Sequence, residues 1–281
     1  MVRLGRDPLR IGAFEFLWGS RTYVMGIINV TPDSFSGDGL TSVEAAVDRA
    51  RDMERGGADL LDVGAESTRP ETWAGPGLSE AEELARLIPV IEAVAGAVRI
   101  PISVDTYKAS VARRALAAGA RMVNDVFGLR RDPGMAAAVA EAQVPLIVMH
   151  NGSTPAGVDL IDGVLGGLKE SLTLATRAGI DPGRVLVDPG IGFGKDRDGN
   201  LEIVRRLHEF AQLGNPLLVG PSRKSFIGKT LDLPVDDRVE GTAAIVALCI
   251  AGGADIVRVH DVRSMVRVAR MTDAVVRGLS S

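Results

Sequence analysis

Polar residues stand at the ends of a series of short apolar runs, and their types indicate which chemistry the chain can perform. The set comprises Asn29, Asp62, Asp105, Asn124, Asp125, His150 with the preceding Met149, Asp188, Ser222, Arg223, Lys224, Arg258 and His260. Carboxylates such as Asp105 and Asp188 suit a flat heterocycle with several N–H donors, because one carboxylate accepts two parallel N–H bonds. Cations such as Lys224, Arg258 and a protonated His260 suit phosphate or a developing anion. A ligand that joins a polar ring to phosphates would use both kinds of group.

A single polar residue at a strand end has a simpler interpretation, since an Asp or Asn there often caps the next helix or orders a turn. That interpretation is harder to sustain when such residues end every run. Burying so many polar groups without a ligand would cost roughly 1–3 kcal/mol for each unpaired group. The pattern therefore favours a binding site.

The residues of this set end eight apolar runs, which alternate with helical segments. The runs span 24–30, 59–64, 101–105, 122–126, 145–150, 185–189, 216–220 and 255–260. Apolar residues recur at helical spacing in the segments 42–55, 80–95, 109–118 and 239–251. Three helix ends share one short sequence motif, in which Gly-Ala precedes a charged residue: Gly56-Gly-Ala-Asp59, Ala118-Gly-Ala-Arg121 and Gly252-Gly-Ala-Asp255. Glycine at such a position is typical of a helix C-terminus at which one residue adopts the left-handed backbone conformation before a tight turn into a strand.

This alternation predicts an α/β fold, a single (β/α)8 TIM barrel, because strands that are apolar on both faces are typical of parallel sheets covered by helices. A doubly wound open sheet is the alternative, but no Gly-x-Gly-x-x-Gly follows the first run. We expect residues 1–23 to form a short extension or hairpin at the bottom of the barrel and residues 24–275 to form the barrel, giving one domain over 1–281. The polar strand ends would then meet at one face.

The overall composition excludes several classes of protein. The net charge of −4 provides no global field that would attract nucleic acid or an anionic membrane. The charged N-terminus does not resemble a signal peptide, and no apolar run approaches the roughly 18 residues of a spanning helix. We therefore expect a cytoplasmic protein. The only cysteine, Cys249, excludes an intramolecular disulfide and lies in an apolar run, where a small buried side chain is expected.

Two loops, 31–39 and 65–77, are long for a barrel and rich in Gly, Pro, Ser and Thr, as mobile lids are. Solvated connectors are the alternative interpretation. A third segment, 188–195, has the glycine content of a phosphate-binding loop but lacks the Walker spacing.

Eight motifs follow one another along the chain. They are GIINVTPDSFS at 26–36, ESTRP at 66–70, SVDT at 103–106, NDV at 124–126, MH at 149–150, DPGIGFGK at 188–195, SRKSFIG at 222–228 and RVHD at 258–261. In this order they resemble the dihydropteroate synthase family of pterin-binding barrels, over residues 24 to about 275. The chain departs from the family's usual sequence at 36–39, 64–66 and 151–155. These departures affect the loops and the p-aminobenzoate site that the resemblance implies.

The resemblance implies condensation of 6-hydroxymethyl-7,8-dihydropterin diphosphate with p-aminobenzoate to 7,8-dihydropteroate and pyrophosphate, a step of folate synthesis. It implies that the pterin ring is held by Asp105, Asn124, Asp188 and Lys224, in a slot lined by Met149 and Phe193. The implied diphosphate site comprises Asn29, Thr68, Arg258 and His260, and Asn29 also reaches a Mg2+ ion. The implied p-aminobenzoate site comprises Phe35, Ser67, Thr68, Arg69, Pro70 and Ser225. The implied catalytic residues are Asp105, Lys224, Arg258 and His260.

By the same resemblance, loss of diphosphate leaves a methylene cation conjugated to the pterin, and the aromatic amine then attacks it. Cationic side chains and Mg2+ would stabilise the departing anion, and the closed loops would exclude water. Sulfonamides are expected as competitive inhibitors. A homodimer is expected, and the Ala-rich helices 239–251 and 262–276 offer an apolar face for it.

Three alternatives differ in the residues they need. A methyltransferase that moves a methyl group from tetrahydrofolate to a corrinoid protein would not need 222–224, 258–260 or the loop 31–35. A non-catalytic pterin-binding paralogue would have lost loop residues, yet 31–35 and 67–70 are intact. A purely structural role leaves the polar strand ends unexplained.

Overall fold

The computed structural model describes residues 6–30, 42–65, 77–155 and 157–278. Within these residues eight parallel strands form one sheet in the order β8-β7-β6-β5-β4-β3-β10-β9. Their bounds are β3 (Tyr23–Asn29), β4 (Leu60–Gly64), β5 (Ile102–Asp105), β6 (Met122–Asp125), β7 (Leu146–Met149), β8 (Val185–Asp188), β9 (Leu218–Val219) and β10 (Ile256–Val259). A parallel bridge between Val187 and Leu217 joins β8 to β9 and closes the sheet. The predicted (β/α)8 barrel is confirmed, and the open sheet is excluded.

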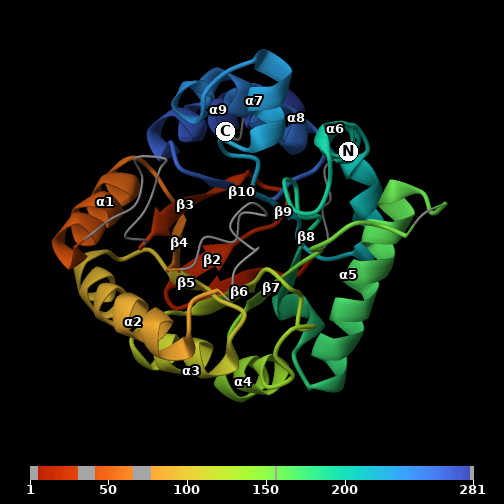
Figure 1. Ribbon diagram of the computed structural model, residues 1–281. Helices are drawn as coiled ribbons and strands as arrows, with labels where there is room; N and C mark the ends of the chain where they lie inside the picture. The colour runs from red at the N-terminus through yellow and green to blue at the C-terminus, as the bar shows by residue number, and fades with distance from the viewer. Residues whose placement is uncertain (1–5, 31–41, 66–76, 156, 279–281) are drawn as a thin grey trace.

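Helices surround the barrel (Figure 1). They are α1 (Val43–Arg55), α2 (Glu80–Ala97), α3 (Ala109–Ala117), α4 (Met135–Ala142), α5 (Leu160–Arg177), α6 (Arg197–Arg205), α7 (Ser225–Leu231), α8 (Val239–Ala251) and α9 (Val262–Val276). Short 3-10 turns occupy η2 (Pro182–Arg184), η3 (Leu207–Leu213) and η4 (Val235–Asp237). The four helices predicted from spacing are present, and their bounds differ from the prediction by no more than two residues. Within the described residues, no helix is both long and apolar enough to cross a membrane.

The predicted glycine turns lie one residue beyond the helix caps. The cap residues Gly56 and Gly252 keep right-handed helical angles, and the following Gly57 and Gly253 adopt φ of +96° and +100°. Gly119 does the same at +122° after α3. The left-handed residue is thus the one after the cap, where glycine avoids the steric cost of a Cβ.

Side chains alternate between two hydrophobic cores because successive residues of a strand face opposite sides of the sheet. In β4, Leu61 and Val63 face the helices and belong to the large outer core. Leu60 faces the barrel interior, whose lower part is filled by the inward residues Tyr23, Met25, Leu60, Met122, Ile147, Leu186, Leu218 and Ile256. The next inward position, two residues further along a strand, is therefore the one that reaches the upper face.

The N-terminal hairpin plugs the lower end of the barrel, as predicted. Its strands β1 (Leu9–Ile11) and β2 (Phe14–Phe16) pair antiparallel. Leu9, Ile11, Phe16 and Trp18 pack in the same cluster as the inward residues of the barrel. Among the described residues, side chains therefore fill the barrel interior at this end.

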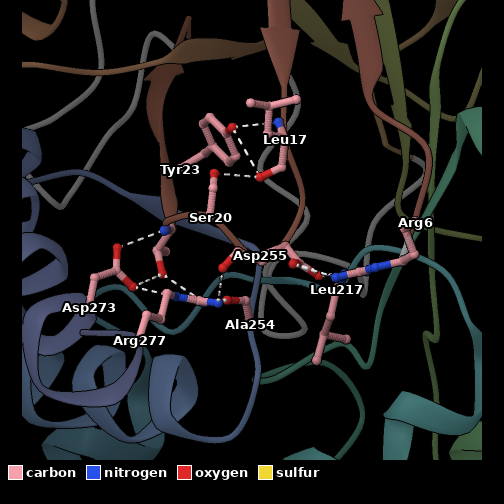
Figure 2. Close-up of polar contacts among 11 residues, drawn as sticks. Arg6, Leu17, Ser20, Tyr23, Leu217, Ala254, Asp255, Asp273 and Arg277 are labelled. Carbon is pink, nitrogen blue, oxygen red and sulfur yellow. Dashed lines mark hydrogen bonds and ion pairs between the residues drawn. The ribbon is translucent and has the colours of Figure 1, made fainter. Parts of the chain in front are cut away.

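Buried ion pairs hold the lower end together (Figure 2). Asp255 accepts a hydrogen bond from the backbone N of Leu217 (2.8 Å) and a bidentate pair from Arg6 (2.8 and 2.6 Å). Asp273 of α9 accepts from the backbone N and the hydroxyl of Thr22 (2.7 and 2.8 Å), and Arg277 donates to Asp273 (2.7 Å). These contacts tie the N-terminal segment and α9 to the beginnings of β3, β9 and β10.

Candidate functional site

Four strands, β4, β5, β6 and β10, bring four polar side chains into direct contact at the upper face of the barrel. Asp62 of β4 accepts hydrogen bonds through Oδ2 from Arg258 Nε (2.6 Å) and from Asn124 Nδ2 (2.9 Å). Arg258 also donates from Nη2 to Asp105 Oδ2 (2.8 Å). Asp62, Asp105 and Asn124 are buried. Each of these three residues lies two positions after another residue of its own strand that faces the barrel interior. The Arg258 side chain reaches them from β10. The predicted convergence of Asp105, Asn124 and Arg258 is therefore seen in the fold.

One guanidinium pairs with two carboxylates in this cluster. Within the described residues, Oδ1 of Asp62, Oδ1 of Asp105 and the hydroxyl of the neighbouring Ser103 are buried without a hydrogen-bond partner. Burial, followed by the charge of Asp62, raises the pKa of Asp105 to about 7, against the opposing effect of Arg258. Buried acceptors without a partner at the ends of these strands suit a ligand that brings N–H donors.

Asp188 and an apolar slot form the neighbouring part of the site. Asp188 ends β8, and its Oδ1 accepts from the backbone N of Gly190 (2.7 Å). Burial raises the pKa of Asp188 to about 6, although that hydrogen bond and nearby cations act in the opposite direction. Val126, Met149 and Phe193 form a separate small hydrophobic cluster, with Phe127 packed against it. The ammonium of Lys224 lies 3.9 Å from the centroid of the Phe193 ring.

The glycine-rich segment 188–195 folds closely against β7. Gly190 has φ of +73°, and a Cβ added there would lie 1.9 Å from the carbonyl oxygen of His150. A Cβ on Gly192 would lie 2.6 Å from Cδ of Lys224. The ammonium of Lys195 donates to the carbonyls of Phe193 (2.9 Å), Gly190 (3.1 Å) and His150 (3.4 Å). These glycines thus allow close approach, and Lys195 holds the Phe193 loop in place.

The residues expected around the diphosphate have different hydrogen-bond partners. The Ser222 hydroxyl accepts from the backbone N of His260 (3.1 Å) and lies 2.9 Å from His260 Nδ1. Arg223 forms a bidentate pair with Asp261 (3.0 and 2.7 Å). Arg258 instead faces the barrel interior through its two carboxylate partners.

His150 is a neutral group in this fold. Its imidazole is buried, and burial, with the charges of Lys195 and Arg130, lowers its pKa to about 3. Cys249 is buried in α8, as expected, and burial raises the pKa of its thiol to about 12. Neither residue has the character of a catalytic cation or nucleophile.

The remaining predicted residues are placed only in part. Asn29 ends β3, is partly buried and pairs in register with Gly64. Ser225 is exposed at the start of α7, next to Lys224. The other predicted residues of the two loops lie outside the described residues: Phe35, Ser67, Thr68, Arg69 and Pro70. Within the described ranges, no group of three or more His, Cys, Asp or Glu residues could hold a metal ion.

The sequence does not single out Asp62 or Lys195. Asp62 is one of many polar strand ends, and Lys195 is the last residue of the 188–195 motif. Their partners are distant in sequence, so no local spacing could identify those contacts. The period of two along β4, which places Asp62 two residues after the inward Leu60, is the signal that could have indicated its direction.

Sequence comparison places the chain among known enzymes. The family model described as "Pterin binding enzyme" matches residues 25–260. A dihydropteroate synthase of Bacillus subtilis is 49% identical and aligns with 90% of this chain and 88% of its own length. One of Clostridium beijerinckii is 45% identical, over 96% of this chain and all of the relative.

Solved structures agree with that placement. A dihydropteroate synthase of Clostridium difficile, determined in the presence of pteroic acid, superposes with a TM-score of 0.88 at 46% identity, covering 93% of this chain and 99% of the other. A Xanthomonas albilineans enzyme with 4-aminobenzoic acid gives 0.85 at 44% identity, covering 92% and 94%. A Yersinia pestis enzyme in a sulfonamide drug complex gives 0.89 at 37% identity, covering 96% and 98%. The chain belongs to the dihydropteroate synthase family of pterin-binding enzymes, which are transferases of folate synthesis.

Proposed function

We propose that the enzyme binds the pterin ring of 6-hydroxymethyl-7,8-dihydropterin diphosphate between Asp105, Asn124 and Asp188 and the apolar slot of Met149 and Phe193. The observation that carries this proposal is the buried Oδ1 of Asp105, which has no hydrogen-bond partner among the residues that the structure describes. A dihydropterin ring brings N–H donors to such acceptors, and its flat faces suit Met149 and Phe193. Lys224, whose ammonium lies over the Phe193 ring, would donate to the ring's acceptor atoms.

The diphosphate would lie toward Asn29, Thr68, Arg258 and His260. The bonds of Arg258 to Asp62 and Asp105 use its Nε and one Nη2 hydrogen, so the remaining N–H groups can donate to phosphate oxygens. The Ser222 contact fixes the direction of the His260 ring. Thr68 lies outside the described residues.

The residues present are compatible with Mg2+ bound together with the substrate. Mg2+ usually takes one or two protein oxygens and completes its shell with water and substrate phosphates, so a cluster of carboxylates is not required. The Asn29 amide oxygen is a hard ligand at the end of β3. Bound there, the ion would stabilise charge on the departing diphosphate.

p-Aminobenzoate would bind nearer the opening, against Ser225 and the loop residues Phe35, Ser67, Thr68, Arg69 and Pro70. Ser225 supports this assignment because it is exposed and adjacent to Lys224. The relatives solved with 4-aminobenzoic acid and with a sulfonamide drug support binding of both ligand types by this chain. Sulfonamides would then compete with p-aminobenzoate.

The chain's own residues favour a dissociative path. Asp62, Arg258 and Asp105 together carry one net negative charge when both carboxyl groups are ionised, and Asp188 is buried nearby. That charge would stabilise a cation that develops on the pterin methylene as the C–O bond to diphosphate breaks. The aromatic amine then forms the C–N bond and releases its proton to solvent. Catalysis would depend on Asp105, Lys224, Arg258 and His260.

A homodimer would cover an apolar surface on the last two helices. Leu248 of α8 is 56% exposed, and Met271 and Val275 of α9 are 65% and 74% exposed. Large exposed apolar side chains on adjacent helices favour a protein interface. The cytoplasmic location stays a prediction.

Pyrophosphate release tests the proposed site. Release should require the pterin diphosphate, p-aminobenzoate and Mg2+ together, and Asp105→Asn and Lys224→Ala should each abolish it while circular dichroism remains unchanged. Glu92→Gln, at an exposed position on α2, is the matched control and should behave as the unmodified enzyme. Near-normal rates in either site variant would contradict the assignment. Binding of the pterin without turnover by the unmodified protein would instead indicate the non-catalytic paralogue.

A further inference from the structure

The centre of the polar cluster is Asp62, a residue to which the proposed function gives no contact with the substrate. Asp62 is completely buried in the middle of β4 and pairs in register with Ile27 of β3 and Ser103 of β5. Its two partners, Asn124 and Arg258, belong to β6 and β10, each two strands away on opposite sides. One carboxylate oxygen thus joins both of these side chains across the barrel interior.

We propose that Asp62 is a positioning residue that fixes the directions in which Asn124 and Arg258 meet the pterin diphosphate. This inference rests on the proposed function of those two residues. Asp62 lies two residues beyond the apolar floor residue Leu60, as Asn124 and Arg258 lie two residues beyond the floor residues of their own strands.

The contact with Asn124 selects one orientation of its amide. A carboxylate only accepts hydrogen bonds, so Asp62 draws the amide nitrogen of Asn124 toward itself. The amide oxygen of Asn124 and its second N–H are then left for the ligand. An adjacent acceptor and donor match a pterin edge, on which ring N–H groups and unprotonated ring nitrogens alternate. Without Asp62 the amide could rotate and present the opposite pattern.

The contact with Arg258 fixes the plane of its guanidinium. Arg258 donates from Nε to Asp62 and from Nη2 to Asp105, so two carboxylates hold two different edges of one rigid group. Loss of the first bond would leave the guanidinium free to turn about the second. A displacement of about 1 Å in a positioned group can cost on the order of 100-fold in rate.

The charge of Asp62 acts on Asp105 as well. Burial and the Asp62 carboxylate raise the pKa of Asp105, as does Glu83 more weakly, whereas Arg258 and Lys224 lower it. Asp62 therefore contributes to the negative floor of the site in addition to orienting its neighbours.

Steady-state kinetics on Asp62→Ala and Asp62→Asn provide the test, with a dissociation constant for the pterin diphosphate from calorimetry. Asp62→Ala should raise the KM for the pterin diphosphate about tenfold and lower kcat by roughly 10- to 100-fold, while the KM for p-aminobenzoate changes less than about twofold. Asp62→Asn keeps an acceptor oxygen, so its pterin KM should lie between those of the unmodified and alanine enzymes.

Asp59→Ala is the matched control. Asp59 directly precedes β4 and is paired with Arg21 (2.5 and 3.0 Å) and with the backbone N of Val24 (2.8 Å), but at the lower end of the barrel. Its loss should reduce stability and leave both KM values unchanged. A double variant Asp62→Ala, Asn124→Ala should cost less than the sum of the single changes, because Asp62 acts through Asn124.

Several outcomes would overturn the inference: unchanged pterin KM in folded Asp62→Ala, equal changes in both KM values, an asparagine variant no better than alanine, or additive double-variant effects. If Asp62→Ala does not fold, Asp62→Asn decides alone. It should weaken pterin binding by roughly 3- to 10-fold because a charge-assisted bond is lost, and an unchanged dissociation constant would refute the role. Failure of the unmodified enzyme to bind the pterin diphosphate would instead refute the proposed function.

Discussion

At the scale of single residues, burial in the barrel controls the charge of the site. Asp105 and Asp188 end their strands inside the fold, and desolvation is the largest cause of the raised pKa of each, to about 7 and about 6. His150, at the end of β7, is kept neutral by the same effect. Ionisation of the two carboxyl groups therefore falls near the working pH of most enzymes.

This leads to a pH dependence of pterin binding. Two parallel N–H bonds need the carboxylate form of Asp188, and a raised pKa means that the proton is retained up to about pH 6. Calorimetric titration should therefore show pterin diphosphate binding weakening as the pH falls from 8 to 5. Asp188→Asn should bind weakly throughout that range. A dissociation constant that stays level over this range in the unmodified enzyme would argue against a pterin role for Asp188.

At the scale of elements, the alternation of inward and outward residues along each strand determines what reaches the upper face. Leu60 and Asp62 share the inward side of β4, and Met122 and Asn124 share that of β6. The outward side is closely packed against helices. Gly26 of β3 faces this layer, where an added Cβ would lie 2.7 Å from the sulfur of Met53 in α1 and 3.2 Å from Val262 in α9.

Gly26→Ala should therefore push α1 and α9 away from β3 and lower the free energy of unfolding by roughly 1–3 kcal/mol. The matched substitution is Gly96→Ala in α2, where an added Cβ meets nothing within 4 Å. It should leave stability unchanged or raise it by up to about 1 kcal/mol, because alanine favours the helix. Urea denaturation measures both, and equal effects at the two positions would show that the packing argument is wrong.

At the scale of the whole molecule, the barrel separates a stabilising lower end from a functional upper face. The hairpin and the ion pairs of Arg6, Asp255 and Asp273 hold the lower end (Figure 2), and the polar strand ends occupy the upper one. This separation is general for such barrels, since the loops that follow the strands carry the chemistry.

Asp255→Ala should consequently destabilise the enzyme with little effect on catalysis. The substitution would leave the Leu217 N–H and the Arg6 guanidinium without their carboxylate, a loss of roughly 3–5 kcal/mol for a buried pair. Thermal unfolding should show a clearly lower Tm, and both KM values measured at low temperature should match the unmodified enzyme. A changed pterin KM would mean that the two ends are coupled.

The proposed dimer is also a property of the whole molecule. Replacing both Met271 and Val275 by Glu would place charge on the apolar surface of α9 and should convert the dimer to monomers in sedimentation velocity. Val158→Glu changes an exposed apolar residue before α5 and should leave the dimer intact. Persistence of the dimer in the double variant would exclude this surface as the interface.

Much of this molecule was determined by the sequence alone. Eight apolar runs separated by amphipathic helices predicted the barrel, because periods of two and 3.6 are local properties of strands and helices. The least accurate prediction was the run 216–220, which forms a strand of only two residues. Closure of the sheet there depends on the bridge between Leu217 and Val187. The polar ends of the runs indicated Asp105, Asn124 and Asp188 as site residues, and the fold brings them to one face.

Only the tertiary structure decided how those residues meet. Asp62 and Arg258 are separated by 196 positions along the chain, and Asp62 and Asn124 by 62, so no local pattern encodes their contacts. The direction of Arg258, into the barrel toward two carboxylates, follows from the closed arrangement of strands, which places β10 and β6 on either side of β4. The physical reason is that the local sequence determines the side-chain types and the periods of strands and helices. The pairing of side chains inside a barrel depends instead on closure of the whole sheet.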